Sequence, residues 1–278
     1  EARPTSSTTL PPSTEAPTTT VAPVDPFALR PPAPGGDPEA LATQIVASER
    51  VLRDPGARDA AVAEAALAQQ VAYRQLGDHP EWDQAVEALL PDDLRPSVAL
   101  HTGARRELRA LGGTARTSLP AWRIVVPPPL ADLTRSYQDA GTEFGLDWPY
   151  LAAINLVETG FGRIRGTSEA GARGPMQFMP RTWAAYGGGG DIEDPHDAIF
   201  GAARLLAANR GATDMANALF QYNHSDRYVR AVTGYAQLIA AEPMALRSLY
   251  YWGVYYRTVR GDIYLTVDYE ETAPVPVP

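Results

Sequence analysis

One carboxylate occupies a position where the chain otherwise places apolar side chains. Leu151, Ile154 and Glu158 are spaced i, i+3 and i+7, so they share one face of a helix predicted over residues 148–158. Burying an unpaired carboxylate is costly, and burial raises its pKa. A carboxyl group with a raised pKa suits general-acid catalysis near neutral pH. Glu158 is therefore the first candidate catalytic residue.

A purely structural role for Glu158 is the alternative. Arg163, Arg165 and Arg173 follow it closely, and an ion pair with one of them would satisfy the carboxylate without any chemistry. Five glycines also fall within residues 160–174, which predicts a backbone that turns tightly or lies against a ligand. A flexible loop explains the same glycines, so the residue pattern alone leaves both alternatives open.

Three short motifs follow one another along residues 158–223. They read Glu-Thr-Gly-Phe at 158–161, Gly-Pro-Met-Gln-Phe-Met-Pro at 174–180 and Gln-Tyr-Asn at 221–223, with Ser-Glu-Ala-Gly-Ala at 168–172 between the first two. Together they resemble the soluble lytic transglycosylase (SLT) family. The resemblance covers about residues 129–240, and it implies a mainly α, lysozyme-like domain related to goose-type lysozymes.

The resemblance implies a reaction on peptidoglycan, the β-1,4-linked polymer of bacterial cell walls. The bond cleaved would join N-acetylmuramic acid to N-acetylglucosamine. Glu158 would protonate the glycosidic oxygen and then accept the proton of the sugar's 6-hydroxyl as a 1,6-anhydro ring closes, while the substrate's N-acetyl group stabilises the cationic centre. No water enters, so no second carboxylate is required, and we expect no metal or other cofactor.

Further site residues are implied by the same resemblance. The expected substrate contacts are Ser168, Met176, Gln177, Tyr222, Asn223 and Tyr228. Ser168 would contact the sugar near the catalytic carboxyl, and Met176 and Gln177 would line the glycan groove. The hydroxyl of Tyr222 would reach toward Glu158, with Asn223 supporting its loop. Tyr228 could pack on a sugar face, although aromatic residues at helical spacing are more often core residues.

The chain departs from the family at three motif positions. Thr159 stands where the family usually has Ser, and a threonine hydroxyl can make the same hydrogen bond. Pro175 replaces the usual Leu, and Gln221 replaces the usual Ala. None of these changes removes a group that the chemistry needs.

An acidic segment at residues 191–197 lies outside the motifs. Asp194 before Pro195 predicts the N-cap of the following helix. A second catalytic carboxylate at Asp191 or Asp194, which would favour a hydrolase, is an alternative. A calcium loop is another, although the spacing does not match an EF-hand.

The composition of the chain divides it into five segments. These are a disordered Pro/Ser/Thr-rich linker (1–36), a helical accessory region (37–113), a connector (114–128), the transglycosylase-like catalytic domain (129–240) and a β-hairpin with a frayed tail (241–278). The linker cannot bury enough apolar surface to fold. Alternation around Gly261 predicts the hairpin, whereas helical periodicity elsewhere predicts a mainly α protein.

Charge and cysteine content exclude several classes. The net charge of -9 argues against a nucleic-acid partner, and the absence of cysteine excludes disulfides and zinc–thiolate sites. No stretch of about 18 apolar residues is present to span a membrane. Because the sequence begins at Glu1, we expect a secreted enzyme, or one anchored through a segment outside this chain. We expect a monomer acting on glycan strands at the cell wall, with cell-wall or division-machinery proteins as candidate partners.

Two other functions stay open beside the transglycosylase. One is a lysozyme-type hydrolase acting on the same bond. The other is a non-catalytic peptidoglycan-binding protein, but the presence of Glu158, Gln177 and Tyr222 counts against it.

Overall fold

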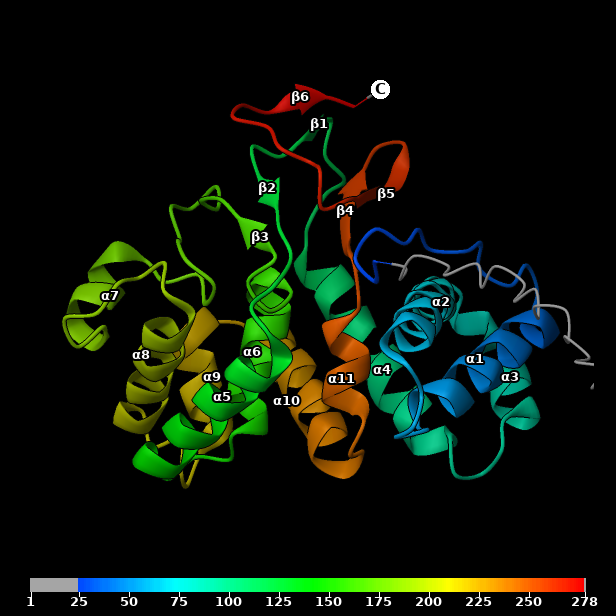
Figure 1. Cartoon of the computed structure of the whole chain (residues 1–278), viewed down its shortest axis with the longest axis horizontal. Coiled ribbons are helices and arrows are strands. Elements are labelled where there is room, and N and C mark those ends of the chain that lie inside the picture. Colours follow the sequence, from blue (N-terminus) through cyan, green and yellow to red (C-terminus); the bar gives the residue numbers. More distant parts are fainter. Residues whose placement is uncertain (1–24, 278) are drawn as a thin grey trace, which may run out of the picture.

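The computed structural model describes residues 25–277, which form a mainly helical protein with three two-stranded sheets (Figure 1). The helices are α1 (Pro38–Leu52), α2 (Asp59–Asp78), the 3-10 turn η1 (Pro80–Trp82), α3 (Asp83–Leu89), α4 (Arg95–Leu111), α5 (Leu130–Phe144), α6 (Pro149–Thr159), α7 (Pro180–Tyr186), α8 (Pro195–Ala208), α9 (Met215–Asn223), α10 (Asp226–Ala241) and α11 (Ala245–Tyr250). The strands are β1 (Ser118–Leu119), β2 (Arg123–Ile124), β3 (Ile164–Arg165), β4 (Val254–Thr258), β5 (Gly261–Leu265) and β6 (Val275–Pro276). The mainly α prediction is confirmed.

Helices α1 to α4 build the accessory region around a core of their own. Asp37 caps α1 by accepting from the N–H of Ala40 at 2.8 Å, and Pro38 occupies the first turn, where its missing N–H costs nothing. Helix α2 packs against both α1 and α4. Leu41 and Tyr73 are among the buried residues that these helices share.

Helix α10 joins the accessory region to the helix that carries Glu158. It packs against α4 on one side and against α6 on another, while α5 packs against α8 (Figure 1). Ala104 of α4 belongs to the same buried cluster as Leu151 of α6 and Val232 of α10. The position of α6 therefore depends on packing that reaches into the accessory region.

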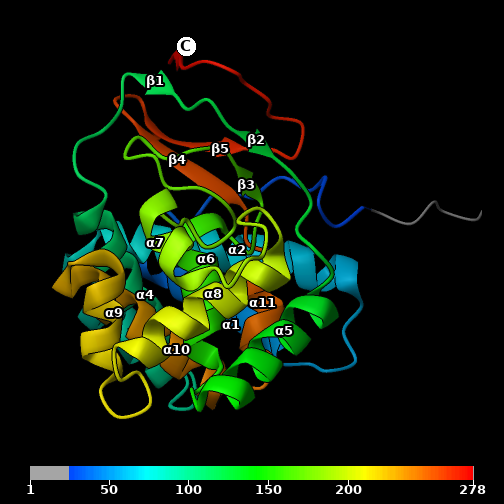
Figure 2. The ribbon, with the colours of Figure 1, turned by 90° about the vertical axis from the view of Figure 1, so that its left-hand side faces the viewer.

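The strands gather on one side of the molecule, above the helices (Figure 2). The predicted hairpin is confirmed as β4 and β5, with Val254 opposite Leu265. The chain after it differs from the predicted frayed tail, because β6 pairs antiparallel with β1 of the connector. Each of these two strands is only two residues long, too short to show an alternating pattern, so the sequence could not predict this pairing.

Part of the predicted linker also contacts the folded chain. Residues 1–24 lie outside the described residues, but Phe27 stacks on Tyr251 with ring centroids 5.5 Å apart. The N–H of Gly35 donates to the side chain of Gln44 at 2.8 Å. Residues 25–36 therefore lie against the helices that follow them.

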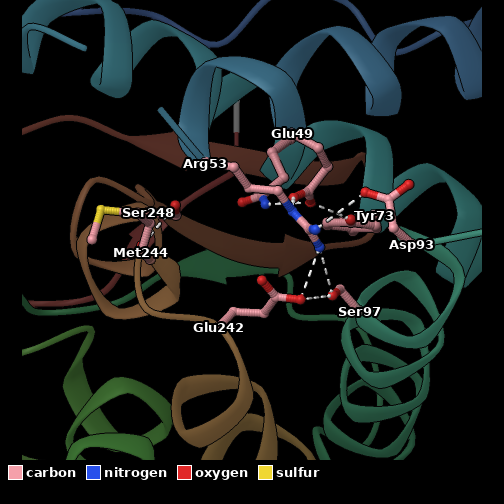
Figure 3. A network of polar contacts seen from close by, with 9 residues as sticks. Glu49, Arg53, Tyr73, Asp93, Ser97, Glu242, Met244 and Ser248 are labelled. Atoms are coloured by element: carbon pink, nitrogen blue, oxygen red, sulfur yellow. Dashed lines mark hydrogen bonds and ion pairs between the residues drawn. The ribbon is translucent and has the colours of Figure 1, made fainter. Parts of the chain in front are cut away.

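A polar network ties the accessory region to the end of α10 (Figure 3). Arg53 donates to Glu242 at 2.9 Å and to Ser97 at 3.0 Å. Its Nε lies 3.5 Å from the buried carboxylate of Glu49, which accepts the hydroxyl of Tyr73 at 2.6 Å. The exposed carboxylate of Asp93 lies 3.5 Å from the same guanidinium, so three carboxylates from separate parts of the chain share it.

We expect Arg53→Met to lower the free energy of unfolding by about 1–2 kcal/mol, since it leaves the buried carboxylate of Glu49 and the partly buried carboxylate of Glu242 without their cation. Chemical denaturation measures the loss. Arg95→Met is the matched control. Among the described residues Arg95 pairs with the exposed Asp92 alone, so this substitution should cost less than about 0.5 kcal/mol. Equal losses in the two variants would contradict the expectation.

Candidate active site

Glu158 lies in the last turn of α6, on the face that the spacing predicted. Leu151 and Ile154 on this face are fully buried, and Glu158 itself is partly buried. The helix ends directly after it, because Gly160 takes the left-handed conformation with φ 59° and ψ 50°. The carboxyl group is therefore held by a rigid helix, at the point where the chain leaves that helix.

The surroundings of this carboxyl group raise its pKa. Burial raises the pKa of Glu158 to about 7, and a hydrogen bond from Tyr228 acts in the opposite direction. The hydroxyl of Tyr228 donates to Glu158 Oε1 at 2.7 Å. With a pKa near neutrality, the group can both donate and accept a proton under physiological conditions.

The alternative of an ion pair with a following arginine is wrong, because none of the three predicted partners pairs with Glu158. Arg163 donates to a backbone carbonyl oxygen at the end of α11. Arg165 and Arg173 both contact Glu193, at 3.3 Å in each case. Within residues 25–277, no cation therefore pairs with the carboxyl of Glu158 to hold it charged.

The acidic residues of the described chain do not change the pKa of Glu158 either. Its pKa is changed by burial and by Tyr228, with no charged group of residues 25–277 contributing. In the acidic segment, Asp194 accepts the N–H of Asp197 at 3.0 Å and caps α8, as predicted. Asp191 accepts the N–H of Glu193 at 2.9 Å. These two carboxylates, candidates for a second catalytic group, serve local hydrogen bonds.

Tyr228, and not Tyr222 as expected, supplies the hydroxyl that contacts Glu158. The hydroxyl of Tyr222 donates to the carbonyl oxygen of Met176 at 2.6 Å and not to Glu158. Its ring lies parallel to that of Tyr228, with centroids 6.1 Å apart. Tyr228 points inward from the first turn of α10, and this placement brings its hydroxyl to the carboxyl group.

Two of the expected substrate contacts are core side chains. Met176 is fully buried, and Tyr228 is 1% exposed. The burial of Met176 does not fit the groove-lining position expected for it, and Tyr228 takes the core position that was the alternative to a sugar contact. Met176 contributes its backbone carbonyl to the site, and Tyr228 contributes its hydroxyl.

The remaining expected contacts reach the surface. Ser168 and Gln177 are partly exposed, and Asn223 is exposed at the end of α9. Ser168 Oγ accepts the N–H of Ala172 at 2.9 Å, and Gln177 Nε2 donates to the carbonyl of Gly174 at 3.0 Å. Both side chains are thus oriented by their own loop.

A buried polar network that the sequence analysis missed anchors this loop to α6. Thr159 is fully buried, and its hydroxyl donates to the carbonyl of Pro175 at 2.6 Å and accepts the N–H of Gly162 at 2.9 Å. Asn155 donates to the same carbonyl at 2.8 Å and accepts the hydroxyl of Tyr137 at 2.6 Å. The sequence signal for this network was Asn155, a polar residue on the apolar face of α6 one turn before Thr159.

Backbone geometry fixes the same loop. Gln177 has φ 48° and Phe161 has φ 65°, a conformation that is uncommon for residues other than glycine. A Cβ at Gly174 would lie 1.9 Å from the carbonyl oxygen of Ile192, so only glycine fits there. The predicted tight backbone is confirmed at these positions.

The comparison with known proteins agrees with this geometry. Residues 135–241 match the family model of the transglycosylase SLT domain. This part of the chain is an SLT domain. It begins within α5 and ends with α10, so Glu158, Tyr222 and Tyr228 all belong to it.

A curated relative matches a segment of similar size. The chain is 38% identical over 86 residues to the membrane-bound lytic murein transglycosylase F of Thiobacillus denitrificans. The aligned segment covers 31% of this chain and 18% of that protein, so the chain spans less than a fifth of its relative's length. No solved structure matches. Within residues 25–277, no helix combines the length and apolar character needed to cross a lipid bilayer.

The SLT domain therefore leaves much of the chain unexplained. Helices α1 to α4 precede it, and the connector strands, α11 and the hairpin also lie outside residues 135–241. Of these segments, α4 and α11 pack directly on helices of the domain, and β2 pairs with β3.

Proposed function

We propose that the chain is a peptidoglycan lytic transglycosylase, which cleaves the β-1,4 bond between N-acetylmuramic acid and N-acetylglucosamine and leaves 1,6-anhydro-N-acetylmuramic acid. The SLT domain supports the reaction class. The observation that carries the proposal is the state of Glu158, a partly buried carboxyl group with a pKa of about 7 that accepts a hydrogen bond from Tyr228 and pairs with no cation of the described residues. Such a group can serve as acid and base in turn.

Glu158 acts twice in the proposed reaction. In its protonated form it gives its proton to the glycosidic oxygen as the bond from that oxygen to C1 of the muramic acid breaks. The substrate's N-acetyl oxygen stabilises the positive charge that develops at C1. Glu158, now a carboxylate, takes the proton of the 6-hydroxyl while this oxygen bonds to C1. The enzyme ends in its starting protonation state, and no water is consumed.

A hydrolase of the ordinary kind needs a second carboxylate within several ångströms of the first, as nucleophile or as base. Asp191 and Asp194, the candidates for such a group, accept backbone N–H groups of their own segment, and this favours the transglycosylase over the hydrolase. The two reactions differ in their products, so product analysis distinguishes them.

The surface residues of the site have proposed roles as substrate contacts. Ser168 and Gln177 present polar groups from the loop that follows Glu158, and Asn223 does so from the end of α9. Tyr222 holds the loop through Met176, and Tyr228 orients the catalytic carboxyl. The enzyme would act at the cell wall, where its glycan substrate lies.

Mass spectrometry of the fragments released from purified peptidoglycan tests the proposal. We expect muropeptides that are one water lighter than hydrolytic products and end in the 1,6-anhydro sugar. Reducing-end products would instead identify a lysozyme-type hydrolase. Binding to peptidoglycan without any release would identify a non-catalytic binding protein. Either of these results would overturn the proposal.

Removing the hydroxyl that contacts Glu158 should move the pH profile of cleavage. The hydrogen bond from Tyr228 favours the charged carboxylate, so Tyr228→Phe raises the pKa of Glu158 further above its ordinary value. The acid then keeps its proton to higher pH, and the alkaline limb of the profile shifts upward. We expect kcat to fall about tenfold, because the carboxyl also loses its orientation.

Tyr222→Phe is the matched control for this prediction. It removes a hydroxyl that bonds to the carbonyl of Met176 and not to Glu158. It should weaken activity through the loop without moving the alkaline limb of the pH profile. A shift in Tyr222→Phe, or none in Tyr228→Phe, would contradict the assignment of the two tyrosines.

A further inference from the structure

A cavity of about 540 Å³ opens beside the loop that carries Ser168. This volume is within the range of small-molecule binding sites in proteins, roughly 300–1,000 Å³. The side chains that give it its chemistry are Arg116, Trp122, Thr167, Ser168, Tyr256 and Arg257. Ser168, one of the proposed substrate contacts, thus lines this cavity.

Most of the cavity wall comes from outside the SLT domain. Residues 167–170 belong to the domain. The other walls come from the connector, from β4, from Gly112 at the end of α4 and from Pro274 near β6. Backbone hydrogen bonds fix these walls to one another. The N–H of Arg116 donates to the carbonyl of Arg257 at 3.2 Å, and the N–H of Val259 donates to the carbonyl of Arg116 at 2.9 Å. The cavity is therefore held by pairing between the connector and the hairpin.

An aromatic pair forms the apolar part of the wall. Trp122 and Tyr256 meet edge to face, with ring centroids 5.3 Å apart, and both are partly exposed. On their buried sides they pack on a cluster that includes Ile124 and Leu265. A Cβ at Gly166 would lie 2.6 Å from Trp122 Cδ1, so the close approach of the loop to this ring requires glycine. Fixed aromatic rings beside hydroxyl groups suit the apolar face and polar edges of a sugar.

The charged groups of the wall favour an acidic ligand. Arg116 and Arg257 line the cavity with one carboxylate, Glu169, which makes the wall net positive in a chain of net charge -9. Arg116 pairs with Glu169 at 3.0 Å, but their side chains are 45% and 73% exposed. An exposed pair of this kind contributes little stability, so a ligand carboxylate can compete for the guanidinium.

We propose that this cavity is an additional binding site for a peptide-bearing N-acetylated sugar of the glycan strand. The sugar ring packs against Trp122 and Tyr256, hydroxyl and acetamido groups bind Thr167 and Ser168, and a carboxylate of the peptide pairs with Arg116. The inference rests on the proposed function for the choice of ligand. It adds ligand contacts from the connector and from β4, which lie outside the SLT domain.

Equilibrium binding to the Glu158→Gln protein tests the site without cleavage. The probes are a peptide-free N-acetylglucosamine tetramer and a peptide-bearing peptidoglycan tetrasaccharide. Trp122→Ala should weaken binding of both by about three- to tenfold, the loss expected for one aromatic contact. Arg116→Gln should weaken only the peptide-bearing probe, by about threefold or more. Arg210→Gln is the control, since Arg210 pairs with Asp214 on the surface in the same manner.

Unchanged affinity of both probes in Trp122→Ala would overturn the site, and an equal effect of Arg116→Gln on both probes would overturn the role of the carboxylate. Trp122 packs on a small core, so thermal unfolding checks that Trp122→Ala stays folded, and Trp122→Phe serves as the conservative variant. Arg116 is exposed, and its substitution leaves that core intact. The proposed function is tested separately by anhydro products of the wild type. If no anhydro products form, the transglycosylase proposal fails, but the binding measurements can still be interpreted. If cleavage is normal and the variants bind both probes as tightly as the parent protein, only the additional binding site is overturned.

Discussion

Glu158→Gln is expected to lower the rate of glycan cleavage by about a thousandfold or more while the protein stays folded. General acid or base catalysis contributes about 10²–10⁴ to a rate, and here one group serves both steps. Glutamine keeps the size of the side chain but can neither give nor take the proton. Mass spectrometry of products released by wild type and variant measures the loss.

The same substitution should stabilise the protein at alkaline pH. The folded-state pKa of Glu158 is about 7 against an ordinary value of 4.5, so between these values the folded state binds more protons than the unfolded state. Stability from this residue is therefore lost as the pH rises from 4.5 to 7. At pH 8 we expect Glu158→Gln to be more stable than wild type by up to about 2–3 kcal/mol, and the difference should vanish near pH 4.

The paired readout separates catalysis from folding. A variant that loses activity because it unfolds would lose stability at every pH. Glu143→Gln supplies the control, because Glu143 is exposed on α5 within the same domain. It should leave both activity and the pH dependence of stability unchanged. Substantial cleavage by Glu158→Gln would remove Glu158 from its proposed role.

The secondary structure and the catalytic candidate could be predicted from sequence for the same reason. Each depends on local periodicity, which places apolar residues on one face of a helix or strand. Glu158 stands out because it breaks that periodicity, and its raised pKa follows from the face on which it lies. Asn155 breaks the pattern in the same way and was overlooked, so the signal was present there too.

The choice between the tyrosines could not be predicted in this way. Tyr228 and Glu158 are separated by 70 residues, and their contact depends on how α10 crosses α6. Motif position favoured Tyr222, which lies only six residues earlier in the chain. Such distances between helices come from tertiary packing, on which local pattern has no bearing.

The same limit applies to the segments around the SLT domain. The pairing of β1 with β6 joins residues at opposite ends of the domain, and each strand is only two residues long. The wall of the cavity beside Ser168 is built from such contacts. The binding site proposed there could therefore not be predicted from sequence patterns.

Thr159→Val is expected to lower the free energy of unfolding by about 2–3 kcal/mol and to lower kcat/KM by tenfold or more. Valine has the shape of threonine but lacks the hydroxyl that donates to Pro175 and accepts from Gly162. The N–H of Gly162 then loses its partner in a buried setting, where an unsatisfied donor costs about 1–3 kcal/mol. Chemical denaturation and product release below the unfolding transition measure the two effects.

Activity should suffer because this hydroxyl fastens the loop to the helix that carries Glu158. The loop between Gly162 and Pro175 includes Ser168, and Gln177 follows directly after it. When the bond is lost, the proposed substrate contacts are no longer fixed relative to the carboxyl group. A misplacement of about 1 Å at such groups can cost about 10²-fold in rate.

Thr159→Ser is the matched control. It keeps both hydrogen bonds and removes only a buried methyl group, which should cost about 1 kcal/mol and leave kcat/KM within about twofold. Thr159→Ser should therefore be both more stable and more active than Thr159→Val. If valine and serine behave alike, the hydroxyl does not position the loop, and the loop must be held by its backbone geometry alone: Gly174 against Ile192, with Phe161 and Gln177 in left-handed conformations.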